Sequence, residues 1–173
     1  MIATRSARWN AGAAPWSVAL EEDVLLVDPA GWAPTRLADE TLATLASHPG
    51  FGAHPSVLCH ATGFHSRAGE ASAELARARA RLETDLRRHH VAAAVAGTHP
   101  FATDSNPTLG LRVRIAVPDA EDAVRTLDGI RRHLPVLLAL SANSPFRRGR
   151  DTGFASSRVA LLATRPWTGI PPA

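Results

Sequence analysis

The stretch Ser17–Asp28 reads SVALEEDVLLVD, and the rest of the fold can be built outward from it. The stretch alternates loosely, then becomes apolar, and Pro29 follows, which is typical of a β-strand that ends in a turn. Successive side chains of a strand point to opposite faces, so Glu21 and Asp23 are expected on one face. Strand geometry separates them by about 7 Å. The stretch therefore predicts a strand that carries two carboxylates on one side.

Further strands are expected on either side of this one. Residues 56–64, SVLCHATGF, predict a strand in which His60 faces one way and Cys59 the other. Residues 109–117, LGLRVRIAV, predict another, with both arginines on one side. Two more segments complete the expected strands: the Ala-rich 91–97, and a short strand in the tail, 158–172.

Helices are predicted between these strands. Apolar residues at helical spacing indicate a short helix near 37–45 and a long one over 69–90. Asp119 is expected to cap a further helix, which Pro135 breaks or restarts. Strands of mixed length, separated by helices without regular alternation, favour an α+β fold whose sheet is covered on one side.

Composition narrows the function classes. The 173 residues include 19 basic and 16 acidic side chains and no lysine. A phosphate-loop lysine, a Schiff base and a lysine nucleophile are thereby excluded, so any phosphate must be bound by arginine, backbone amides or metal. The arginines are dispersed among acids, which argues against nucleic-acid binding.

Length and cysteine usage suggest one domain in a reducing compartment. We expect a flexible N-terminus at 1–14 and a single domain over 15–173. The single cysteine cannot form an internal disulfide. The longest apolar stretches, such as 91–95 and 136–140, are far shorter than the ~20 residues that span a bilayer. A cytoplasmic protein with no membrane association is expected.

Two constellations could carry chemistry. The Glu21 and Asp23 carboxylates suit Mg²⁺, which prefers hard oxygen ligands, although the pattern alone favours a solvated strand edge. Residues 140–158, LSANSPFRRGRDTGFASSR, form a donor-rich segment of the kind that builds anion and nucleotide sites, with a plain surface loop as the alternative. The histidines match no metal signature, and Cys59 is expected to be a small core residue rather than a nucleophile.

Several segments match one family in order. The strand VALEEDVLLVDP resembles the opening motif of the bacterial and plant glutamate-cysteine ligases and their carboxylate-amine ligase relatives. Residues 96–101, AGTHPF, are similar to a turn of that family. Residues 134–158, LPVLLALSANSPFRRGRDTGFASSR, resemble its longest and most specific block, and PWTGIPP at 166–172 resembles the segment that follows.

The resemblance implies a partial glutamine-synthetase-like catalytic domain, with an antiparallel sheet that forms a cleft and helices on its back. It implies an ATP- and Mg²⁺-dependent ligase that activates a carboxylate as an acyl phosphate for attack by an amine, with glutamate and cysteine as default substrates. By resemblance, Glu21 and Arg158 are catalytic, and Glu21 and Asp23 hold Mg²⁺. The cofactor-binding residues implied are Ser141, Asn143, Ser144 and Arg158.

The chain also departs from the family pattern. Asp23 stands where the family has a glutamate, Cys59 falls on another family glutamate, and Arg112 and Arg114 replace two histidines. The chain covers about the N-terminal half of the family's fold. The alternative is therefore a degenerate remnant or accessory subunit that binds an anionic ligand or a partner chain without turnover. Either way, a homodimer or a complementary chain is expected, because an incomplete sheet leaves an open edge.

Overall fold

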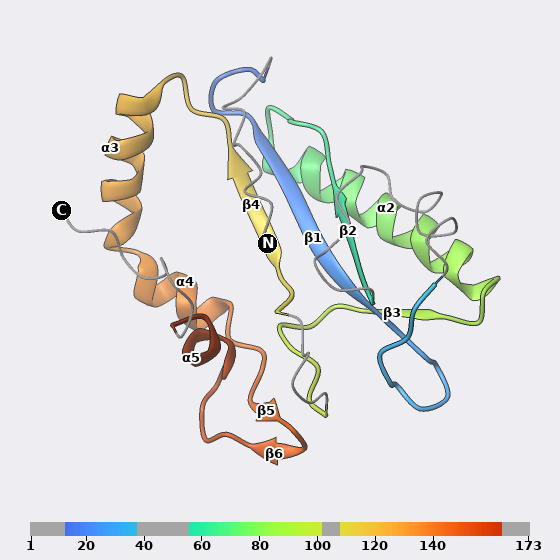
Figure 1. Cartoon of the computed structure of the whole chain (residues 1–173). Helices are drawn as coiled ribbons and strands as arrows, with labels where there is room; N and C mark the ends of the chain where they lie inside the picture. Colours follow the sequence, from blue (N-terminus) through green and yellow to red (C-terminus); the bar gives the residue numbers. More distant parts are fainter. Residues whose placement is uncertain (1–12, 38–55, 102–107, 164–173) are drawn as a thin grey trace, which may run out of the picture.

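The structure is a computed structural model, and it describes residues 13–37, 56–101 and 108–163 (Figure 1). The expected flexible terminus at 1–14 and the short helix near 37–45 fall almost entirely outside these residues. So does the end motif at 166–172.

Four antiparallel strands form the main sheet, with β1 (Val18–Val27) at its centre. One edge of β1 pairs with β2 (Val57–Ala61). The other edge pairs first with β4 (Leu111–Ile115) and then, near its end, with β3 (Ala92–Ala94). The predicted central strand is confirmed, and every other strand of the sheet is positioned by its pairing with it.

One face of the sheet is covered by α2 (Ala68–Arg87), which runs behind β1 and β2 in Figure 1. The even-numbered residues of β1 point toward this helix, in agreement with strand alternation. A core forms between the two layers, and Leu26 and Leu86 in it have no exposed surface. The buried residues of this core are Val24, Leu26, Leu58, Leu82, Leu86 and Val91.

A charged cluster lies inside the same interface. Glu22 points toward α2 and has no exposed surface. Arg79 of α2 donates two hydrogen bonds to its carboxylate, one of them from Nε at 2.8 Å. His60 Nε2 lies 3.2 Å from Glu22 Oε2. Burial alone would raise the pKa of Glu22, but these hydrogen bonds outweigh it and lower the pKa to about 2. The carboxylate is therefore ionised and paired inside the fold.

The chain continues after β4 into elements that lie on the side of β4 away from α2 (Figure 1). Asp119 caps α3 (Ala120–Arg131), accepting a hydrogen bond from the Asp122 N–H at 2.9 Å. Pro135 occupies the first turn of α4 (Leu134–Leu140), so the helix restarts at the proline, where a missing N–H costs nothing. Neither α3 nor α4 contains a buried residue.

A small hairpin and one more helix complete the described chain. The hairpin pairs β5 (Phe146–Arg147) with β6 (Arg150–Asp151). Its turn residues, Arg148 and Gly149, both have positive φ, at 52° and 73°, as a tight two-residue hairpin turn requires. The hairpin is followed by α5 (Arg158–Ala163).

The start of the tail corrects one prediction, because α5 occupies residues 158–163 of the stretch 158–172 in which a short strand was expected, and the rest of that stretch lies outside the described residues. The segment RVALLA is a short apolar run, and such runs have no periodicity that separates helix from strand. Elsewhere the α+β class with an antiparallel sheet is confirmed. Among the described residues, no helix has the length and apolar character needed to cross a membrane.

Candidate active site

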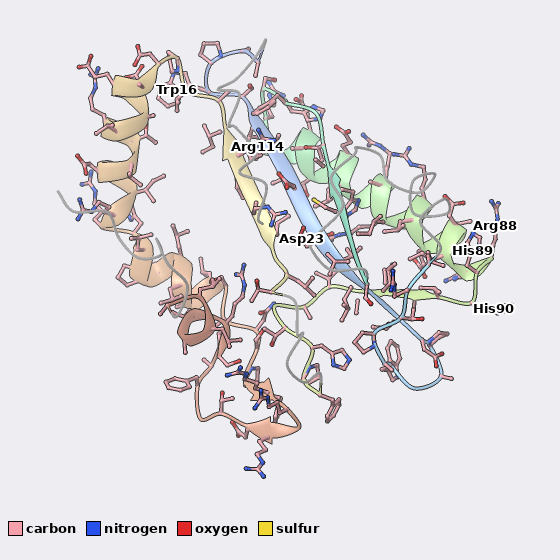
Figure 2. All side chains as sticks on the ribbon, viewed as in Figure 1. Trp16, Asp23, Arg88, His89, His90 and Arg114 are labelled. Carbon is pink, nitrogen blue, oxygen red and sulfur yellow. The ribbon has the colours of Figure 1, made fainter. Side chains whose placement is uncertain are left out.

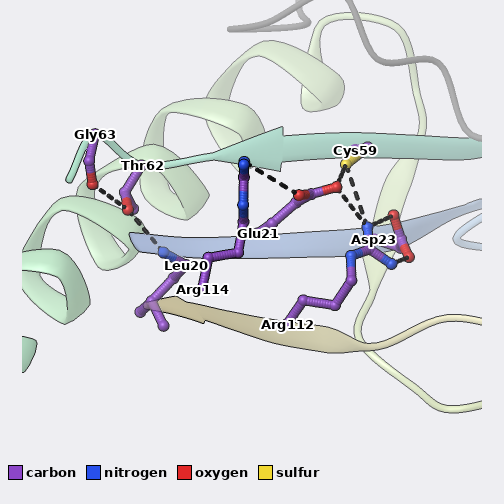
Figure 3. Close-up of polar contacts among 8 residues, drawn as sticks. All are labelled: Leu20, Glu21, Asp23, Cys59, Thr62, Gly63, Arg112 and Arg114. Atoms are coloured by element: carbon purple, nitrogen blue, oxygen red, sulfur yellow. Dashed lines mark hydrogen bonds and ion pairs between the residues drawn. The ribbon is translucent and has the colours of Figure 1, made fainter. Parts of the chain in front are cut away.

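The face of the sheet opposite α2, here called the front face, carries the two predicted carboxylates. Glu21 and Asp23 lie on β1, and the register places Cys59 of β2 beside Asp23 and Arg112 of β4 beside Glu21. These side chains and Arg114 form one contact network (Figure 3). The prediction that Glu21 and Asp23 share a face is confirmed.

Arg112 lies directly on the carboxylate pair. Its Nη1 donates to Asp23 Oδ2 at 2.6 Å and its Nη2 donates to Asp23 Oδ1 at 2.8 Å, a bidentate arrangement. The same Nη2 donates to Glu21 Oε1 at 2.9 Å. Both carboxylates are largely shielded, with side chains 15% and 11% exposed for Glu21 and Asp23. The hydrogen bonds that Arg112 donates to Asp23 raise the pKa of Arg112, so the guanidinium stays charged.

Cys59 adds a neutral donor to this network. Its thiol donates to Glu21 Oε1 at 3.4 Å. Burial, together with the charges of Glu21 and Asp23, raises the pKa of Cys59 to about 12. Since the thiolate is the reactive form, the side chain is inert at neutral pH, in agreement with the predicted core residue.

Arg114 is bound more loosely than Arg112. It lies two residues further along β4, and its Nη1 is 3.9 Å from Glu21 Oε2. The guanidinium carbon lies 5.6 Å from the centre of the Phe64 ring, and half of the side chain is exposed. Figure 2 shows Arg114 on β4 and Asp23 on the neighbouring β1. The guanidinium therefore remains accessible from the front face.

The carboxylate pair does not fit a magnesium ion as it is arranged. Mg²⁺ needs several oxygen ligands at about 2.0–2.1 Å. Here Arg112 takes both oxygens of Asp23 and one of Glu21, and the nearest further side chain is a protonated thiol. Across the described residues, no three acidic, histidine or cysteine side chains are grouped as a metal site would need.

The second predicted cluster gathers around Arg158. A Cβ built on Gly110 would lie 2.9 Å from Arg158 Nη2, so the guanidinium occupies space that only glycine leaves free. A Cβ on Gly97 would overlap Ser144 Oγ and lie 2.6 Å from Asn143 Oδ1. Two glycines thus permit Asn143, Ser144 and Arg158 to approach the sheet.

Short backbone links hold these segments together. Ser157 donates through its N–H and its hydroxyl to the Ser144 carbonyl, at 2.7 and 2.9 Å, which closes the hairpin loop just before Arg158. The Leu109 N–H donates to the Gly97 carbonyl at 2.9 Å. Ser141 is the exception among the predicted residues, because it is exposed and its hydroxyl donates to the Leu138 carbonyl within α4.

Arg158 has one donor atom without a partner among the described residues. Its Nε is buried and makes no hydrogen bond to any described residue. An unsatisfied buried donor costs about 1–3 kcal/mol. Arg158 as a whole is only partly buried, although its Nε is covered by the chain. An anionic oxygen would satisfy this donor only after the groups that cover Nε move aside.

The two clusters belong to one surface. Gly110 precedes Arg112 by two residues, and the Asp23 N–H donates to its carbonyl, so the space above Gly110 is on the front face. Gly110, Arg112 and Arg114 follow one another on this face at backbone steps of about 7 Å, and Arg158 of α5 lies over Gly110. With Glu21 and Asp23 included, this surface holds three arginines and two carboxylates.

Comparison with known proteins finds sequence similarity to one family. A sequence model described as Glutamate-cysteine ligase family 2 (GCS2) matches residues 105–173. A protein of Rubrobacter xylanophilus, provisionally named glutamate-cysteine ligase 2-3, is 34% identical over 91% of this chain and 51% of its own length. A glutamate-cysteine ligase of Halobacterium salinarum is 35% identical over 60% of this chain and 35% of its own length. The chain belongs to the glutamate-cysteine ligase family.

This member of the glutamate-cysteine ligase family spans about half the length of the curated relatives it matches most extensively. The family match at 105–173 includes Arg112, Asn143, Ser144 and Arg158, while Glu21 and Asp23 lie outside it. The family match thus covers the arginines of the front face and not its two carboxylates.

Sequence reasoning missed several residues that shape the site. Gly97 and Gly110 were not singled out, because a close approach from a distant segment leaves no local pattern. Arg112 and Arg114 were placed on one side of a strand, but the register that brings Arg112 onto the carboxylates was not available. The alternating Arg-Val-Arg pattern, read against the acidic pair of residues 21–23, was the only signal that could have suggested it.

Proposed function

We propose that this chain carries the anion-binding part of a carboxylate-amine ligase site of the glutamate-cysteine ligase type. The supporting observation is Arg158, a permanently charged side chain with a buried, unpartnered Nε, held over Gly110 on the front face. In a chain without lysine, arginine is the permanently charged side chain available for such a role.

ATP is the proposed source of this anion. Arg158, Asn143 and Ser144 would hold its phosphate groups or the substrate carboxylate beside them, with Arg114 accessible further along β4. Bound ATP would supply the phosphoryl group that activates a carboxylate for attack by an amine. Glutamate and cysteine are the proposed acid and amine, because the relatives are named for them. No step is assigned to Mg²⁺ at Glu21 and Asp23.

Calorimetric titration with ATP, with and without Mg²⁺, tests the proposal. Wild type is expected to bind, and Arg158→Ala to lose about tenfold or more in affinity, since a charged hydrogen bond contributes about 1.5–3 kcal/mol. The matched control is Arg87→Ala, which removes an exposed arginine of α2 whose ion pair, among the described residues, is with Glu83. Equal affinities in the Arg158 variant and wild type, or no binding by the folded wild type, would contradict it.

A second candidate function is binding without turnover, as an accessory subunit. It is favoured by Arg112, which occupies the carboxylate of Glu21, expected to be catalytic, and that of Asp23, expected to hold Mg²⁺. Measurement of ADP release in the presence of glutamate and cysteine separates the two candidates. Release above the ATP-only background supports the ligase. ATP binding without release, by the chain alone and with any purified partner chain, supports the accessory role.

A further inference from the structure

The Glu21–Asp23 pair already has a cation, supplied by the chain itself. Arg112 makes three hydrogen bonds of 2.6–2.9 Å to the two carboxylates. Bidentate guanidinium–carboxylate contacts of this kind are among the strongest charged hydrogen bonds in proteins. Because both carboxylates are mostly shielded from water, the interaction is weakly screened by salt.

The charges around the pair already balance, so no net negative charge remains for a metal ion to neutralise. The two carboxylates carry two negative charges, and Arg112 with the looser Arg114 carries two positive charges. A divalent ion entering here would add two positive charges within a few ångströms of a permanently charged guanidinium. It would also have to break the bidentate contact with Asp23 before reaching its oxygens.

The surroundings offer no replacement ligand. Cys59 contacts Glu21 as a thiol donor, and Arg112 Nη2 lies 3.6 Å from its sulfur. On the opposite face of β1, Glu22 is committed to Arg79 and His60. Among the described side chains near the pair, every acid therefore already has a cationic partner.

We propose that Arg112 is the resident cation of the Glu21–Asp23 pair, and that the front face binds no divalent metal ion there unless Arg112 is removed. The proposal does not depend on the ligase assignment. Under it, any divalent ion that accompanies a nucleotide is held by the nucleotide phosphates and not by these two carboxylates.

Titration with Mn²⁺, followed by the loss of its free-ion electron paramagnetic resonance signal, tests the proposal without any activity measurement. Wild type and Asp23→Asn are expected to bind Mn²⁺ equally weakly. Arg112→Ala is expected to gain one site at least tenfold tighter than any in wild type. That site should disappear in the double variant Arg112→Ala/Asp23→Asn.

The matched control is Arg114→Ala, which removes an arginine from the same strand and face but leaves the bidentate contact intact, and it should gain no site. The proposal is overturned if wild type binds Mn²⁺ in a way that Asp23→Asn abolishes. It is also overturned if folded Arg112→Ala gains no site. If Arg112→Ala fails to fold, Arg112→Gln replaces it, and the comparison of wild type with Asp23→Asn remains decisive.

Discussion

At the scale of single residues, Glu22 shows how the chain keeps a charge inside its core. The side chain has no exposed surface, yet its pKa lies well below the ordinary value because Arg79 and His60 bind the ionised form. Arg79 itself is about half exposed, so water reaches the outer side of the pair. Removing Arg79 leaves a buried charge without its main partner, whereas removing Glu22 leaves an arginine that water can reach.

Arg79→Ala is expected to destabilise the fold by about 2–3 kcal/mol, because Glu22 would remain buried with only a histidine as partner. Urea denaturation at pH 7 measures the change. Arg81→Ala, an exposed arginine on the same helix, serves as control and should change stability by less than about 0.5 kcal/mol. Equal effects in the two variants would contradict the assignment.

Glu22 also predicts a pH dependence. Its folded pKa is lowered from 4.5 to about 2, so the stabilisation is fully present above 4.5 and is lost as the pH falls toward 2. Urea midpoints of wild type and Glu22→Gln, compared between pH 7 and pH 2.5, are expected to converge at the acidic end. If the two urea midpoints differ by the same amount at pH 7 and at pH 2.5, the charge of Glu22 does not contribute to stability.

At the scale of elements, β4 organises the site, because one strand positions Arg112, Arg114 and the free space above Gly110. Arg158 reaches that space from α5, about fifty residues further along the chain. The approach requires glycine at position 110 and a closed hairpin loop before α5.

Gly110→Ala is expected to weaken ATP binding nearly as much as Arg158→Ala does, while stability changes by less than about 1 kcal/mol. The new methyl group would lie 2.9 Å from the end of a flexible arginine, which can move away but then leaves its position. Calorimetry and urea denaturation report the two quantities. Gly129→Ala in α3, where nothing lies within 4 Å, is the control, and it should leave ATP affinity unchanged.

The elements also show how far sequence reasoning reaches. The strand at 17–28 and the helix at 69–90 were predicted within a few residues of β1 and α2, because their apolar patterns are long and periodic. The Asp119 cap was also predicted. The helix α5 and the hairpin were not, since each is short and is held by contacts such as Ser157 with Ser144.

Prediction of the site was limited in the same way. Alternation alone placed Glu21 and Asp23 together, because that rule is local. The pairing of Asp23 with Arg112 spans 89 residues and depends on strand register, which no local pattern contains. The roles assigned to Ser141, Asn143, Ser144 and Arg158 stay predictions, of which the structure brings the last three together.

At the scale of the whole molecule, much apolar surface is exposed beyond the sheet core. Leu111, Val113 and Ile115 of β4 point to the side of the sheet that holds α2, but α2 does not cover them, and each is 46–60% exposed. Among the described strands, β4 pairs only with β1 and leaves its other edge open. Open edges and apolar patches are usually covered in stable proteins.

We therefore expect the chain to self-associate or to require a partner chain. Analytical ultracentrifugation of the isolated chain should show species at least twice the monomer mass at micromolar concentration. Val113→Glu, which places a charge on the exposed stripe, should shift the distribution toward monomer. A monodisperse, well-folded monomer of the wild-type chain would contradict this prediction.

The position of Cys59 allows its reactivity to report when the strands around the site separate. It is the only cysteine in the chain and is 8% exposed, and its sulfur lies 3.4 Å from Glu21 Oε1 and 3.6 Å from Arg112 Nη2. An alkylating reagent can react with this sulfur only when β1, β2 and β4 separate enough to release the thiol. The rate of alkylation of Cys59 therefore measures how often these strands separate at the site. Any compound that bridges Arg158 and the front face will slow that rate, so ligands can be screened without an engineered label.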